Sequence, residues 1–135
     1  ILDHNKYLQV LLSVSFLEMR EKYSNSSLSL NITELRNTYV LNNPIHKMHL
    51  RTFEIPMSGG LQIASYTDEL ASYFKEDKEI VLYKSEDELV SKAKFYLHPK
   101  NDFLTSQMKK SARKRAAAEH TWINRFDNIF CEIYN

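Results

Sequence analysis

The adjacent pair Gly59-Gly60 is the feature of this sequence that most constrains its fold. The 135-residue chain contains only these two glycines, whereas an average composition of about 7% would give roughly nine. Glycine allows the backbone to turn sharply or to approach a ligand closely. Apolar residues at helical spacing precede the pair, and a short apolar run at residues 61–64 follows it. The stretch from 51 to 64 therefore predicts a helix, a glycine turn and a buried strand.

Three other segments have the pattern of strands. Residues 28–32 alternate apolar and polar side chains, and residues 80–83 are rich in β-branched and aromatic side chains. An apolar segment at 7–12 is also interpreted as a strand. A capping box formed by Ser15 and Glu18 starts a new helix soon after it, which argues against one long helix there.

Helix boundaries are marked along the rest of the chain. Thr67 is a candidate N-cap, and a second capping box at 85–88 opens a helix that Pro99 ends. Two further helices are expected from residue 101 onward, meeting near His120-Thr121. Strands and helices thus alternate, and the chain closes with helices. This order predicts one α/β domain over residues 1–135, a Rossmann-like parallel sheet flanked by helices.

Bulk composition excludes several classes of protein. Hydrophobic residues make up 43% and charged residues 26% of the chain, and the net charge is +1, so no overall field attracts nucleic acid or anionic lipid. No apolar run approaches the roughly 20 residues of a membrane span. The chain has no recognisable signal peptide and a single cysteine, Cys131, which predicts a cytoplasmic protein. Because the sequence does not begin with Met, we expect it to be a piece of a longer protein.

The helix at residues 51–57 carries the side chains that predict a binding site. In open α/β sheets the ligand binds beyond the carboxyl ends of the strands, and the irregular segment 34–47, which we expect to be poorly ordered without ligand, leads from such an end to this helix. A helix start suits a phosphate, and Arg51 can add a charge-assisted hydrogen bond. Glu54 can only accept hydrogen bonds, so its natural partners are hydroxyl pairs such as those of ribose. On spacing alone, a surface ion pair between Arg51 and Glu54 explains the same residues equally well.

These residues resemble the C-terminal lobe of group 1 glycosyltransferases, and most closely the branch described as CgeB-like or spore-maturation-like. The similarity extends from about residue 10 to residue 126 and depends on the order and spacing of several short motifs. The matching segments are Val14-Ser15-x-x-Glu18-Met19, Leu28-x-Leu30-Asn31, Arg51-x-Phe53-Glu54, Gly59-Gly60, Asp68-Glu69-Leu70, Phe74, residues 79–83, Glu88-Leu89 and His120-Thr121-x-x-x-Arg125.

The resemblance implies the C-terminal half of a two-lobed GT-B fold, which binds a nucleotide-diphosphate sugar as donor substrate. By this resemblance Glu54 corresponds to the glutamate that binds the donor ribose, and Arg51 faces the diphosphate. Gly59 and Gly60 match the glycines that follow that helix. A retaining, metal-independent transfer without a further cofactor is implied, and no catalytic residue is identified.

Two departures from the family pattern shape this expectation. His46 stands where many relatives carry a second glutamate, eight positions before Glu54. The N-terminal lobe that binds the acceptor is absent, and so are the first two strands of the C-terminal sheet. We therefore expect either a fragment of a longer glycosyltransferase or a degenerate relative, and in both cases a piece that is inactive alone.

Two alternative functions stay open at this point. The basic run at 109–115 supports a nucleic-acid-binding module, although the low net charge and the lack of interleaved aromatic residues favour a solvated helix face. A non-catalytic interaction domain that kept the fold and lost the donor site is the other alternative.

The remaining reactive side chains are expected to be structural. His46 and His49 are three residues apart, but the sequence has no metal-ligand pattern and we expect no metal. His120 precedes a helix start and is interpreted as a structural contact. Cys131 shares a helix with several apolar residues, Phe126, Ile129, Phe130 and Tyr134, and is expected to lie in the core.

Overall fold

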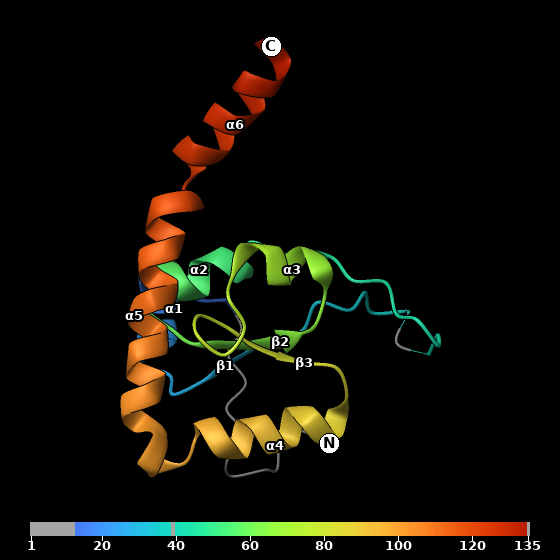
Figure 1. Cartoon of the computed structure of the whole chain (residues 1–135), viewed down its shortest axis with the longest axis vertical. Helices are drawn as coiled ribbons and strands as arrows, with labels where there is room; N and C mark the ends of the chain where they lie inside the picture. Colours follow the sequence, from blue (N-terminus) through green and yellow to red (C-terminus); the bar gives the residue numbers. More distant parts are fainter. Residues whose placement is uncertain (1–12, 39, 135) are drawn as a thin grey trace.

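A computed structural model describes residues 13–134 of the chain, with residue 39 excepted. The elements in chain order are α1 (Phe16–Asn25), β1 (Ser29–Asn31), α2 (Arg51–Met57), β2 (Gln62–Ser65), α3 (Asp68–Tyr73), β3 (Val81–Tyr83), α4 (Glu86–Tyr96), the 3-10 helix η1 (Pro99–Asn101), α5 (Asp102–Glu119) and α6 (Trp122–Tyr134). Figure 1 shows α2 and α3 on one face of the sheet and α4 on the other. The strand expected at 7–12 lies outside the described residues.

The three strands form a parallel sheet in the order β1-β2-β3. Leu30 pairs with Ile63, and Ala64 pairs with Leu82. All four residues of the central strand β2 are buried, as expected for a strand covered on both faces. The strands fall within the segments predicted at 28–32 and 80–83 and overlap the one at 61–64, which confirms the α/β fold class.

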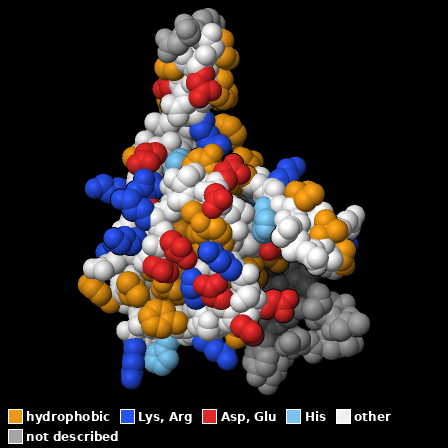
Figure 2. All heavy atoms as spheres, turned by 45° about the vertical axis from the view of Figure 1, so that its right-hand side comes forward, with side chains coloured by type: hydrophobic (Ala, Val, Ile, Leu, Met, Phe, Trp, Pro, Cys, Tyr) orange, Lys and Arg blue, Asp and Glu red, His pale blue; other side chains and the backbone are white. Residues whose placement is uncertain are grey.

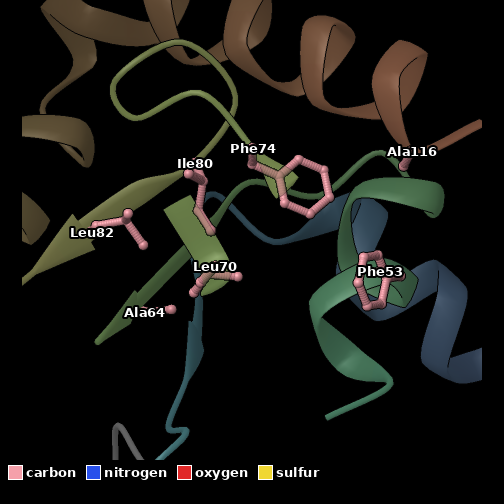
Figure 3. Close-up of a cluster of buried hydrophobic side chains, with 7 residues drawn as sticks. All are labelled: Phe53, Ala64, Leu70, Phe74, Ile80, Leu82 and Ala116. Atoms are coloured by element: carbon pink, nitrogen blue, oxygen red, sulfur yellow. The ribbon is translucent and has the colours of Figure 1, made fainter. Parts of the chain in front are cut away.

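Helices bury both faces of the sheet because alternate strand residues point to opposite sides. One cluster, drawn in Figure 3, consists of Phe53, Ala64, Leu70, Phe74, Ile80, Leu82 and Ala116. The other consists of Leu61, Ile63, Val81, Tyr96 and Met108. The long helix α5 contributes Met108 to one cluster and Ala116 to the other, so it holds the two layers together.

The first capping box is confirmed, and the second is formed differently from the prediction. The Glu18 amide donates to Ser15 Oγ at 3.3 Å, and the Ser15 amide donates to the Glu18 carboxylate at 2.7 Å. At α4 the Glu88 amide donates to Ser85 Oγ at 3.2 Å, but the Glu88 carboxylate accepts from the amide of Lys84, one residue before the cap, at 2.8 Å. The carboxylate still satisfies a backbone donor beside the helix start.

The other predicted helix boundaries are confirmed. Thr67 caps α3 by accepting the amide of Leu70 at 3.1 Å. Helix α4 ends at Tyr96, three residues before Pro99. Helices α5 and α6 meet at His120-Thr121.

The expectation that Cys131 lies in the core is wrong. Cys131 is exposed, and its apolar neighbours Phe126, Ile129 and Phe130 keep 50%, 49% and 52% of their surface exposed. Figure 1 shows α6 extending away from the sheet, and Figure 2 shows hydrophobic side chains along this projecting helix. An amphipathic pattern identifies an apolar helix face, but it does not show whether another element covers that face.

Segment 34–47 begins and ends as a short antiparallel stem. The Leu35 amide donates to the Ile45 carbonyl and the Lys47 amide donates to the Thr33 carbonyl, both at 2.8 Å, around a bridge between residues 34 and 46. Figure 1 shows the segment projecting from the body of the domain. Its poor order in the absence of ligand stays a prediction.

Candidate functional site

A cleft of about 380 Å³ lies beside α2, between α1 and the start of α6. Its lining is mainly apolar, and the side chains that matter for binding are Phe16 and Arg20 from α1, Glu54 from α2, and Trp122 and Arg125 from α6. A volume in this range is typical of sites for small molecules. Glu54, the residue predicted to bind ribose, therefore lies in this cleft among cationic and aromatic side chains.

Glu54 reaches the cleft because its neighbours fix the rotation of α2. Phe53 and Ile55 are buried, with 7% and 1% of their surface exposed, whereas Glu54 is half-buried. Among the described residues, no ion pair or hydrogen bond engages the Glu54 carboxylate. The surface ion pair with Arg51, which explained this stretch equally well from spacing alone, is therefore not formed.

Two arginines at the cleft are held against aromatic rings. The guanidinium carbon of Arg125 lies 3.9 Å from the centroid of Phe53, and that of Arg20 lies 5.8 Å from the centroid of Phe16. Neither guanidinium forms an ion pair with a carboxylate of the described part of the chain. Cation–π contacts of this kind position a charge without neutralising it.

His120 anchors the junction of α5 and α6 beside the cleft, which confirms its structural interpretation. Its Nε2 atom lies 3.2 Å from the Tyr73 carbonyl oxygen. Its ring packs at centroid distances of 5.2 Å from Phe53, 5.2 Å from Phe74 and 5.3 Å from Tyr73. These contacts place the first turn of α6, with Trp122 and Arg125, against α2.

Arg51 lies at the first position of α2, is exposed and is not among the residues that line the cleft. Leu50, the residue before it, provides no side-chain cap. Burial raises the pKa of the Tyr23 phenol, while the charge of Arg51 lowers it and that of Glu54 raises it. Tyr23 of α1 is thus close enough to sense both charges. The structure brings Glu54 to the cleft and leaves Arg51 outside its lining.

Gly59 and Gly60 form the end of α2 farthest from Arg51. The Gly60 amide donates to the Ile55 carbonyl and the Gly59 amide donates to the Pro56 carbonyl, both at 2.9 Å, and Gly59 has a φ of 85°. This is the Schellman arrangement of a helix C-terminus. A Cβ atom on Gly60 would lie 2.8 Å from the Tyr23 carbonyl oxygen. The glycines therefore turn the chain into β2 and allow α1 to pack closely, and neither lines the cleft.

A polar cluster lies at the carboxyl ends of the strands. The Ser65 hydroxyl lies 2.5 Å from a Glu34 carboxylate oxygen and 3.1 Å from the Tyr83 hydroxyl. Burial raises the pKa of Tyr83, and its hydrogen bond with Ser65 opposes that rise. Beside it, His46 Nδ1 lies 2.9 Å from Thr33 Oγ1. These contacts fasten the stem of segment 34–47 to the sheet.

The basic run at 109–115 is partly used within the fold. Lys109 Nζ donates to the Ser26 carbonyl at 2.7 Å, and burial lowers the pKa of Lys109. Arg115 forms ion pairs with Glu79 and Glu119. Two of the five basic side chains are therefore engaged in contacts within the fold. This favours a structural role for the run over a nucleic-acid-binding surface.

Two other features, a metal site and a membrane span, are not formed by the described residues. No group of three or more His, Cys, Asp or Glu side chains in this part of the chain is arranged to hold a metal ion. Within the same residues, no helix combines the length and apolarity needed to cross a bilayer.

Sequence reasoning did not assign a role to three cleft residues, Arg20, Trp122 and Arg125. Arg125 belongs to the motif at 120–125 of the glycosyltransferase resemblance, and this motif is the sequence signal that could have identified it. Arg20 and Trp122 have no local signal, because only the packing of α1 and α6 beside α2 brings them to Glu54.

A three-stranded parallel sheet flanked by helices, with a cleft lined by one carboxylate and two guanidinium groups, defines a domain of the Rossmann-like class. The chain belongs to the family described as glycosyl transferase-like, whose family model matches residues 7–130. No curated protein and no solved structure matches the chain. The family match confirms the resemblance to glycosyltransferases.

Proposed function

We propose that the chain is the donor-binding lobe of a cytoplasmic GT-B glycosyltransferase of the CgeB-like branch. In this role it binds a nucleotide-diphosphate sugar, and a second lobe supplies the acceptor. Membership of the glycosyl transferase-like family and the Rossmann-like sheet support the proposal. The observation that carries it is the unpaired Glu54 carboxylate at a mainly apolar cleft.

The chemistry of Glu54 favours a diol as its partner. Withdrawing a carboxylate from water is costly unless hydrogen-bond donors replace the water. A ribose offers two adjacent hydroxyl donors, which a carboxylate accepts through its two oxygens. Glu54 therefore recognises the sugar part of the nucleotide.

The aromatic residues of the cleft supply the complementary contacts for a base. Trp122 and Phe16 keep 61% and 63% of their surface exposed, although both line the cleft. Stacking on such rings is tolerant of base identity. By the family resemblance, Arg51 reaches the diphosphate from the start of α2. Gly59 and Gly60 form the turn that connects α2 to β2.

Isothermal titration calorimetry with UDP, GDP and uridine tests this assignment. A charge-assisted hydrogen bond contributes roughly 1.5–3 kcal/mol, so Glu54→Ala should weaken nucleotide binding by about 10- to 100-fold. Glu54→Gln keeps the shape and one acceptor and should lose less. Arg51→Ala should weaken the diphosphates more than uridine.

Glu86→Gln provides the matched control, because Glu86 is exposed at the start of α4 on the other face of the sheet. This variant should bind as the wild type does. Equal nucleotide binding by the wild type and Glu54→Ala would place the site elsewhere. A wild type that binds no nucleoside diphosphate would favour the non-catalytic interaction domain.

A further inference from the structure

Two cations from different helices lie in one cleft, and neither forms an ion pair within the part of the chain that the structure describes. Arg20 comes from α1 and Arg125 from α6, and Glu54 is the only carboxylate among the described residues that line the cleft. Since neither guanidinium is paired with that carboxylate, the cleft keeps an excess of positive charge. An anionic group is the ligand chemistry that this excess fits.

Elsewhere in the fold an arginine of similar burial is neutralised. Arg115, on α5, forms ion pairs with both Glu79 and Glu119, and these carboxylates hold its pKa above the ordinary value. Arg125 is also half-buried, yet it contacts the Phe53 ring and forms no ion pair with a carboxylate of residues 13–38 or 40–134. Its N–H donors therefore stay available to a ligand.

We propose that Arg20 and Arg125 bind the two phosphates of a nucleoside diphosphate in the cleft beside Glu54. This inference rests on the proposed function and adds residues that the family resemblance does not assign. Each phosphate of a phosphoanhydride carries negative charge, and a guanidinium binds such oxygens in a bidentate manner. The two arginines come from different helices, α1 and α6, and both line the same cleft, so a ligand with two phosphates offers one anionic group to each.

The contact with Phe53 preorganises Arg125, whereas Arg20 is exposed and lies farther, at 5.8 Å, from the exposed ring of Phe16. Arg125 is fixed on Phe53, the residue next to Glu54, and Arg20 lies over Phe16 of its own helix. Long side chains lose conformational freedom when they bind, and prior placement reduces that loss. The ligand thus joins α1, α2 and α6 through one diphosphate and one ribose.

Calorimetry on two variants tests the pair. Arg20→Ala and Arg125→Met each remove a guanidinium, and the methionine preserves apolar packing against Phe53. Each change should lower UDP affinity by about tenfold or more, the effect of losing a charge-assisted hydrogen bond. Uridine affinity should stay within about twofold of the wild type, since uridine carries no phosphate.

Inorganic pyrophosphate serves as the second probe, because it carries the phosphates without the nucleoside. Wild-type protein should bind pyrophosphate, and the double variant Arg20→Ala/Arg125→Met should lose that binding. Arg113→Ala is the matched control: Arg113 is exposed on α5 and does not line the cleft. It should bind both probes as the wild type does.

The outcomes separate this inference from the proposed function. An unchanged UDP-to-uridine affinity ratio in both arginine variants overturns the phosphate pair and leaves the role of Glu54 standing. A wild type with no affinity for any nucleoside diphosphate overturns both this inference and the nucleotide function, even where pyrophosphate binding requires both arginines. Circular dichroism of each variant verifies that the fold is retained.

Discussion

The guanidinium carbon of Arg125 lies 3.9 Å from the centroid of the Phe53 ring. Phe53 precedes Glu54 on α2, and its buried ring also packs against His120. The contact therefore joins the first turn of α6 to the helix that carries the candidate ribose ligand. Through it, two segments far apart in the sequence contribute to the lining of one cleft.

The two glycines should differ in their sensitivity to substitution. Gly60→Ala places a Cβ atom 2.8 Å from the Tyr23 carbonyl oxygen, so α1 must move, and the overpacking should cost about 1–3 kcal/mol or more. Gly59→Ala has space around it but must adopt a φ of 85°, which costs about 1–2 kcal/mol. Urea unfolding monitored by circular dichroism measures both values. A neutral Gly60→Ala would contradict the close approach of α1 to α2.

The two carboxylates paired with Arg115 should contribute unequally to stability. Glu79 has 8% of its surface exposed and also accepts the Lys75 amide at 2.8 Å. Removal of one partner from a fully buried ion pair costs roughly 3–5 kcal/mol. Glu79→Ala breaks a pair that is only partly shielded from solvent, so this range is the upper limit of its expected cost. Glu119 has 55% of its side chain exposed, so Glu119→Ala should cost less than about 1 kcal/mol. Equal losses in urea unfolding of Glu79→Ala and Glu119→Ala would argue against this difference.

The stability contributed by Glu88 should depend on pH. Its hydrogen bonds with the Lys92 side chain and the Lys84 amide lower its pKa below the ordinary 4.5. A carboxyl group with a lowered pKa in the folded state stabilises the fold above its unfolded pKa, and this contribution is lost as pH falls through the folded pKa. Glu88→Gln should therefore be less stable than the wild type at pH 7, with the gap closing below pH 4.5. A pH-independent gap in urea unfolding would be inconsistent with this linkage.

The tip of segment 34–47 should respond to nucleotide. We expect fast amide hydrogen exchange at residues 36–38 and 40–43 without ligand, and slower exchange when UDP is bound. Val40 and Leu41 are 72% and 49% exposed, and within the described residues the Thr38 and Leu41 amides are hydrogen-bonded only to carbonyls three residues back in the chain. The amides of Leu35 and Lys47, which are hydrogen-bonded in the stem, should be protected in both states. Mass-spectrometric exchange with and without UDP measures this. Full protection of the tip in the free protein would refute the prediction.

Short-range patterns of residues predicted the local elements of the fold. Apolar alternation and β-branched content located the segments of β1 and β3, and a short apolar run located β2. Ser15 and Thr67 marked the helix starts correctly, because a cap is a contact between a side chain and a backbone amide a few residues away. The alternation of strands and helices then restricted the sheet to a parallel arrangement. These features depend on short-range geometry, which a single sequence displays.

Local pattern also identified Glu54 as a residue of interest, but not its partners. Arg51 and Glu54 are one helical turn apart, and this spacing was equally consistent with an ion pair between them. The ion pair is not formed in the tertiary structure. Burial of Phe53 and Ile55 turns Glu54 toward the cleft, while Arg51 stays outside its lining.

Long-range packing brings together side chains that lie far apart in the sequence. Arg20 and Arg125 reach the cleft through the packing of α1 and α6 against α2, and no short-range pattern encodes that packing. The same limit explains Cys131: its helix has an apolar face, yet the fold leaves this cysteine exposed. Helical periodicity is a property of neighbouring residues, whereas burial depends on whichever element packs against them.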